Sequence, residues 1–237
     1  MRLRSTVIVL VLAGLCAACL AQAGDVPTTQ PAATQPAAGG PPKPNVVPLQ
    51  WEFTVELDRL RAIPVRLQGQ KEDQLFWYLR YTVINRSDAD HFFVPEFVLY
   101  TDTGQLVRAG RKVPTAVFYA IKKLHNDPML KTQTSMTRKI LLGEDNAKSG
   151  VAIWPDFDAR AGTVDIFIAG LSGETKAIEL PKPVQVVETD WKGNKRTVTK
   201  TRLLLSKTRH LRYSIPGEKS GRRKVVPKLV KKQWVLR

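Results

Sequence analysis

Residues 75–84, LFWYLRYTVI, decide the fold class, because almost every position in this run is apolar. Ten residues this rich in aromatic and β-branched side chains are typical of a strand that is buried on both faces. Residues 85–90, NRSDAD, follow with side chains that favour a turn. The stretch therefore predicts a central strand of a β-sheet.

Shorter strand patterns flank this run on both sides. Apolar and polar residues alternate over 51–57, 63–67 and 163–169, and further apolar runs occupy 92–100, 105–107 and 150–154. Pro95 places the run 92–100 at a sheet edge or a bulge. Short strands with frequent turns predict a mainly β protein, and more narrowly a β-sandwich.

One segment, residues 114–124, has helical spacing instead. Val117, Ala120, Ile121 and Leu124 recur at intervals of three and four, Pro114 suits the first turn, and 126–128 (NDP) ends the pattern. We expect one short inserted helix that caps an end of the sheet pair.

The N-terminal residues 1–23 have the form of a signal peptide. Arg2 and Arg4 precede an apolar run over 5–15, which is too short to span a membrane, and 21–23 (AQA) form a cleavage site. A permanent membrane anchor is the alternative interpretation.

Both cysteines, Cys16 and Cys19, lie in this segment, so cleavage after residue 23 removes thiol chemistry and disulfides from the processed chain. Residues 17–19 (AAC) also resemble the end of a lipobox, so lipidation of Cys19 is an alternative to free secretion.

Residues 24–49 form a Pro/Ala/Thr-rich spacer that contains seven prolines and a tandem TQPAA repeat. Such a composition favours extended polyproline II and cannot bury a core. It predicts either a stalk, which suits a lipid anchor at Cys19, or a leader without a role.

The formal charge of +16 is concentrated at the C-terminal end. Residues 51–180 carry 17 basic and 17 acidic side chains, whereas 181–237 carry 17 basic and 3 acidic ones. Pro181 and Pro183 mark the change, so we expect a β-sandwich domain over 50–180 and a basic β extension over 181–237 packed on it. Within the extension, 184–188 and 196–205 predict a hairpin, 211–215, 225–230 and 233–236 further strands, and 216–224 a flexible cationic loop.

Several strand and turn motifs resemble the extracytoplasmic immunoglobulin-like domains of bacteria. The motifs are 81–87 (YTVINRS), 97–100 (FVLY), 102–104 (DTG), and 143–145 (GED) ahead of 150–154 (GVAIW). The resemblance covers roughly residues 51–170 and implies an immunoglobulin-like fold, whereas many such domains have no assigned activity.

Residues suited to catalysis or metal binding are few. His125 and His210 are expected at the surface, and Asp88, Asp90 and His91 form a metal cluster by residue type but match no zinc or calcium spacing. The acidic pairs Glu144/Asp145 and Asp156/Asp158 fit turns as well as acid–base chemistry. We therefore expect no enzymatic activity, no cofactor and no metal, and we keep a hydrolase built on His91 as a minor alternative.

The basic tail is the strongest candidate for a binding surface. The candidate anion-binding residues are Lys192, Lys195, Arg196, Lys200, Arg202, Arg222, Arg223 and Lys224. Cationic surfaces attract anionic lipid, lipopolysaccharide or acidic protein, and export disfavours nucleic acid as the partner. The sequence thus favours a non-catalytic binding or structural module in the periplasm or at the cell surface, without a transmembrane span after processing. The alternatives are an accessory subunit that pairs with another secreted protein through a sheet edge, and a charged face that only maintains solubility.

Overall fold

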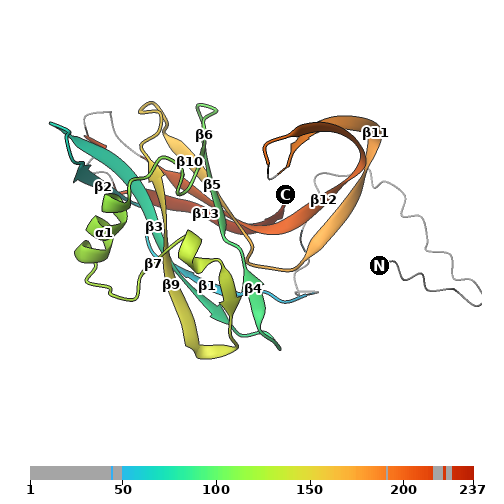
Figure 1. Cartoon of the computed structure of the whole chain (residues 1–237), viewed down its shortest axis with the longest axis horizontal. Coiled ribbons are helices and arrows are strands. Elements are labelled where there is room, and N and C mark those ends of the chain that lie inside the picture. Colours follow the sequence, from blue (N-terminus) through green and yellow to red (C-terminus); the bar gives the residue numbers. More distant parts are fainter. Residues whose placement is uncertain (1–43, 45–49, 191, 216–220, 223–225) are drawn as a thin grey trace, which may run out of the picture. The chain divides into compact units, whose positions relative to one another are not determined.

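The computed structural model describes residues 44, 50–190, 192–215, 221–222 and 226–237. The predicted signal peptide with Cys19, and the predicted spacer except Pro44, therefore lie outside the described residues. The described chain is mainly β, with several sheets and one α-helix, as the sequence predicts (Figure 1). Two large sheets share one hydrophobic core, an arrangement consistent with a β-sandwich.

The first sheet is built around β3 (Asp73–Asn85), which contains the apolar run 75–84. On one side β3 pairs with β1 (Thr54–Leu57) along its second half and with β2 (Arg61–Arg66) along its first half. On the other side it pairs with β9 (Gly143–Pro155), which in turn pairs with β7 (Lys131–Thr132). The apolar run is thus a central strand, as predicted.

The second sheet is built around β10 (Thr163–Ala169), which lies between β5 (Glu96–Thr101) and β12 (Lys195–Ser214). β6 (Leu106–Arg108) continues the sheet beyond β5, and β13 (Lys228–Leu236) pairs with the second half of β12. Leu211, Tyr213 and Ile215, which follow one another on alternate positions of the tail, are buried in the same core as Trp77 and Leu99. The part of the basic tail from residue 207 onward is therefore integral to the two-sheet body.

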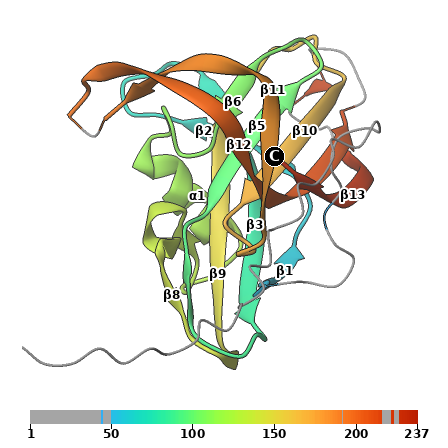
Figure 2. The ribbon, with the colours of Figure 1, turned by 90° about the vertical axis from the view of Figure 1, so that its right-hand side faces the viewer.

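The helix α1 (Thr115–Leu124) occupies the predicted segment but a different place. Its buried residues Val117 and Ile121 join Phe76, Tyr78 and Val151 in a second hydrophobic cluster on the outer face of the first sheet (Figures 1 and 2). The prediction that the helix caps an end of the sheet pair is wrong. A central strand with apolar side chains on both faces needs cover on both, and α1 supplies it on the outer side.

The expected single strand over 92–100 is two strands. β4 (His91–Phe93) pairs with β8 (Arg138–Ile140) in a small separate sheet, whereas β5 belongs to the second large sheet. Pro95, which has no N–H to donate, lies at the break. A short 3₁₀ turn over Thr134–Met136 precedes β8.

β11 (Thr175–Thr189) and the first half of β12 form a long hairpin, residues 175–206, which we call the arm (Figure 1). The predicted strands 184–188 and 196–205 lie within it, and 211–215 begins inside the same β12 strand. The division expected at 180/181 falls inside β11. There the register of the ladder shifts, and Thr201 alone stands opposite residues 180–183 (LPKP). The ladder is interrupted because Pro181 and Pro183 have no N–H to donate to the partner strand.

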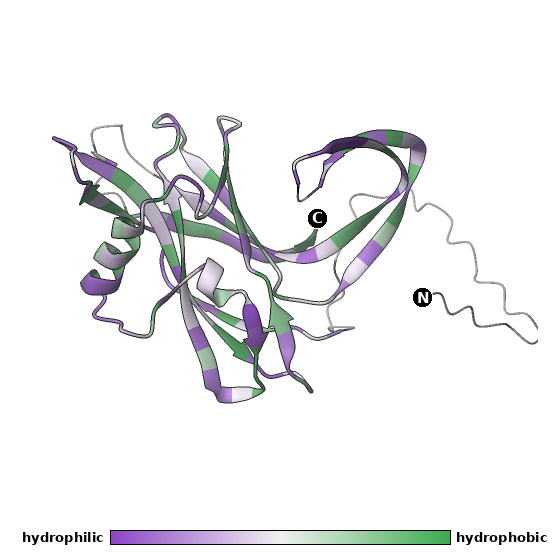
Figure 3. Cartoon of the chain, in the orientation of Figure 1, coloured by the Kyte–Doolittle hydropathy of each residue, from purple (hydrophilic) through white to green (hydrophobic). Residues whose placement is uncertain are grey.

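The arm adds nothing to the buried core. No hydrophobic residue from 175 to 206 is among the described buried residues, and its polar and aliphatic side chains alternate along the ribbon (Figure 3). β11 pairs with β12 alone among the described strands. The arm is thus a two-stranded ribbon whose faces are available for a partner.

Candidate functional site

The arm is the candidate site, and it holds five of the eight predicted anion-binding residues. It carries seven basic and three acidic side chains. Lys195 and Arg202 are exposed and make no ion pair or hydrogen bond through their side chains with the described residues. These two cations remain open to an external anion.

Two other predicted cations share a single carboxylate. The side chains of Arg196 and Lys200 lie 3.0 and 2.9 Å from Glu188, their neighbour on β11. Hydrogen bonds from Lys200 and Arg196 hold the pKa of Glu188 below its usual range, so that it stays ionised. One negative charge between two positive ones leaves this group with a net positive charge. Lys192 lies in the turn, where its backbone N–H donates to Asp190.

Arg222 is not available for an external anion, and the prediction for it is wrong. Its side chain is only 4% exposed, because the guanidinium packs 4.6 Å from the Phe157 ring centroid and 5.5 Å from that of Trp77. Its Nη1 donates to the Asp158 carbonyl at 2.6 Å, and its Nη2 lies 3.3 Å from Asp156. Arg223 and Lys224 lie outside the described residues.

A hollow of about 600 Å³ occurs on the arm where the register shifts. Its walls combine two cations, two threonines and two aliphatic residues. They are Ala177, Thr199, Lys200, Thr201, Arg202 and Leu204. The structure therefore brings together Lys200 and Arg202, two of the candidate anion-binding residues, and adds apolar surface that charge patterning did not indicate.

His210 is buried, contrary to its expected place at the surface. It is 6% exposed, its Nε2 lies 2.7 Å from Asp165, and its Nδ1 lies 3.0 Å from the Gln233 amide nitrogen. Because Gln233 donates to Nδ1, the neutral ring carries its proton on Nε2 and donates it to Asp165. Arg212 binds the same carboxylate through two nitrogens, and Phe167 stacks on the imidazole. With both ring nitrogens engaged, His210 has no free lone pair with which to act as a base.

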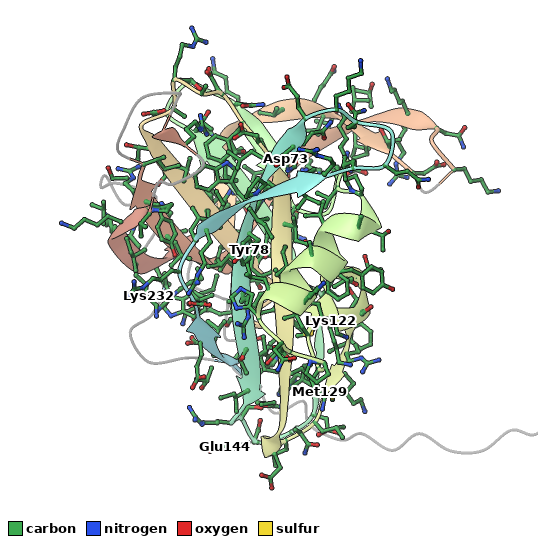
Figure 4. All side chains as sticks on the ribbon, turned by 90° about the vertical axis from the view of Figure 1, so that its left-hand side faces the viewer. Asp73, Tyr78, Lys122, Met129, Glu144 and Lys232 are labelled. Carbon is green, nitrogen blue, oxygen red and sulfur yellow. The ribbon has the colours of Figure 1, made fainter. Side chains whose placement is uncertain are left out.

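His125 belongs to a polar cluster that the sequence did not reveal. It follows α1, and its Nδ1 accepts from Arg80 at 2.6 Å while its Nε2 lies 3.0 Å from the Tyr78 hydroxyl. Tyr78 lies on β3 (Figure 4). Burial and the Arg80 charge lower the pKa of His125, and burial raises the pKa of Tyr78. The alternation of 76, 78 and 80 on one face of β3 is the signal that could have placed these residues opposite the helix.

The remaining catalytic candidates have structural partners. His91 stacks on Trp51 with ring centroids 4.6 Å apart, and Asp88 is its nearest acidic partner at 3.8 Å. Asp156 accepts from Trp77 Nε1 at 2.8 Å, and Glu144 pairs with Arg86. Within the described ranges, no three His, Cys, Asp or Glu side chains gather as a metal site would require.

A buried ion pair network at the base of the arm also escaped prediction. Lys207 is 2% exposed, and its Nζ lies 2.9 Å from Glu52 and 3.0 Å from Glu174. Burial favours the neutral amine, but the hydrogen bonds with Glu52 and Glu174 outweigh it and raise the pKa of Lys207. The network ties β12 to the segments that precede β1 and β11.

Comparison with family models, with curated proteins and with solved structures found no match for this chain. Among the residues that the structure describes, no helix is long and apolar enough to cross a membrane. The arm is therefore identified as the candidate site from its geometry alone.

Proposed function

We propose that this chain is an exported, non-catalytic binding module, an immunoglobulin-like β-sandwich that docks through its arm on an anionic component of the cell envelope. The classes of partner that fit are anionic lipid, lipopolysaccharide and acidic protein. The N-terminal sequence 1–23 supports export, and residue Cys19 offers a lipid anchor in place of free secretion.

One observation carries the proposal: the arm projects a surplus of cations on a ribbon that contributes no buried hydrophobic residue to the described core. A ribbon of two strands is marginally stable by itself in water, so contact with a partner would stabilise the arm. Lys195 and Arg202 have no acidic partner within the described part of the chain, and exposed cations of this kind attract anionic surfaces over about a Debye length.

The test compares retention of the protein on anionic vesicles and on lipopolysaccharide as salt is raised. We expect the double variant Lys195→Gln/Arg202→Gln to lose retention at about 0.15 M salt, where the Debye length is about 8 Å. The matched control is Lys71→Gln/Lys139→Gln, which removes the same charge from exposed positions on the two-sheet body and should leave retention unchanged. Equal losses in the two variants would show that only net charge matters and would contradict a role for the arm.

A second candidate function rests on the edge of the second sheet. β13 pairs with β12 on one side only among the described strands, which leaves one edge for a strand of another secreted protein. Lys228, Lys231 and Lys232 on β13 oppose this reading, since lysines commonly protect exposed edges from pairing. A defined complex that survives high salt would favour this accessory-subunit role over electrostatic docking.

A further inference from the structure

We infer that the hollow of the arm binds a single anionic amphiphile, with a phosphate or carboxylate head at Arg202 and an alkyl chain along Leu204 and Ala177. The inference rests on the proposed function and names the class of ligand for the same arm. It is argued in turn from the origin of the hollow, its charge and its apolar wall.

The hollow lies beside a local irregularity in the pairing of the two strands of the arm. The pairs Glu179–Arg202 and Val184–Lys200 bracket the shift, so four residues of β11 stand opposite Thr201 alone. Prolines at 181 and 183 keep the ladder from closing, because they have no N–H. The volume of about 600 Å³ is that of a small-molecule site, whereas an inorganic anion needs far less.

The anionic head has one well-placed partner. Lys200 is already 2.9 Å from Glu188, whereas Arg202 makes no ion pair within the described residues, even with its cross-strand neighbour Glu179. A guanidinium can bind two oxygens of a phosphate or carboxylate at once, and Arg202 and Leu204 are two residues apart and so share one face of β12.

The apolar wall distinguishes an amphiphile from a simple anion. Leu204 is 67% exposed, and it faces Ala177 across the ladder, so the hollow includes aliphatic surface that a hydrated anion leaves uncovered. Covering this surface with an alkyl chain is favourable in proportion to the apolar area removed from water. The cation and the aliphatic wall together match a charged head joined to a hydrocarbon body.

The probe is decyl phosphate at concentrations below micelle formation, measured by calorimetry against the whole protein, with inorganic phosphate and decanol in parallel. We expect decyl phosphate alone to bind measurably. Arg202→Gln and Leu204→Ser should each weaken it about tenfold, the ratio that one lost hydrogen-bonded charge or one uncovered leucine produces. The matched controls Lys176→Gln and Val187→Ser remove an exposed arm cation and an exposed arm aliphatic residue outside the hollow, and should change affinity less than twofold.

The outcomes separate this inference from the proposed function. Inorganic phosphate binding as tightly as decyl phosphate would overturn the amphiphile, as would binding of an acidic peptide but not of decyl phosphate. If no amphiphile binds while the arm still governs retention on anionic vesicles, the inference fails and the proposed function stands. If retention is also independent of Lys195 and Arg202, both fail.

Discussion

Gly170 is the described glycine at which an added side chain would come closest to a neighbouring atom. It follows β10 with φ +84°, and a Cβ added there would lie 2.2 Å from the Val94 carbonyl oxygen. Both the left-handed conformation and the contact involve backbone, so no side chain can move to relieve them. We expect Gly170→Ala to lower the free energy of unfolding by about 3 kcal/mol, measured by urea denaturation.

Gly193 in the arm's turn is the matched control. It has a similar φ of +89°, but nothing lies within 4 Å of an added Cβ. Gly193→Ala should therefore cost only the conformational part, about 1 kcal/mol. Equal losses at the two glycines would show that the close approach to Val94 is unimportant.

His125 predicts a pH dependence of stability that carries a definite sign. Burial and Arg80 lower its pKa from the ordinary 6.5, because the guanidinium donates to Nδ1, the atom that would take up the proton. Between the ordinary and the lowered pKa, the unfolded chain binds more protons than the native one, so stability falls as pH drops below 6.5. Urea titrations from pH 8 to 5 should show this slope, and His125→Gln should reduce it. An unchanged slope in the variant would assign the effect to other groups.

At the scale of elements, Lys207 joins the base of the arm to two other segments. Lys207→Met leaves Glu52 and Glu174 without their shared cation, and breaking a buried ion pair from one side costs about 3 kcal/mol. The loss should be larger at pH 7 than at pH 4, because protonation removes the negative charges of Glu52 and Glu174 that Lys207 neutralises. Thermal unfolding at both pH values measures it. Lys182→Met, an exposed lysine of the arm, is the control and should change stability by less than about 0.5 kcal/mol.

Prolines show what the sequence could and could not predict about elements. The apolar run 75–84 predicted the central strand because both faces of that strand are covered. Pro95 predicts a sheet edge or a bulge, and in the structure it separates strands of two sheets. Pro181 and Pro183 predict a boundary, and in the structure they lie at a register shift within β11. A proline shows where a ladder hydrogen bond is missing, whereas the tertiary pairing decides whether a strand bends, ends or changes sheet.

The candidate site was predictable as a charge surplus but not as an arrangement. The charge pattern predicts Lys195 and Arg202 as anion-binding candidates, and both are exposed on the arm. It predicts Arg222 as well, whose guanidinium packs on Phe157. The charge pattern cannot distinguish an exposed cation from one that packs on an aromatic ring, because both kinds of cation have polar residues beside them in the sequence. The ion pairs of Glu188 with Arg196 and Lys200 could not be predicted without the register of the hairpin.

At the scale of the whole molecule, deleting the arm and truncating the chain within it should have different effects on folding. Joining Glu174 to Lys207 through Asn-Gly removes the arm, and these residues already face each other, since Lys207 N–H donates to the Glu174 carbonyl at 2.9 Å. No hydrophobic residue that the structure describes as buried is lost, so we expect the free energy of unfolding to change by no more than about 1 kcal/mol.

Truncation after Pro183 instead removes β12 and β13 with Leu211, Tyr213 and Ile215, all buried in the shared core. Removing one large buried side chain costs about 2–5 kcal/mol, and three such losses equal or exceed the total stability of about 5–15 kcal/mol that a domain has. The truncated chain should lack a cooperative unfolding transition and near-ultraviolet circular dichroism, whereas the chain without its arm should keep both. A cooperative transition in the truncated chain would mean that the second sheet folds without β12 and that the tail is peripheral to the core.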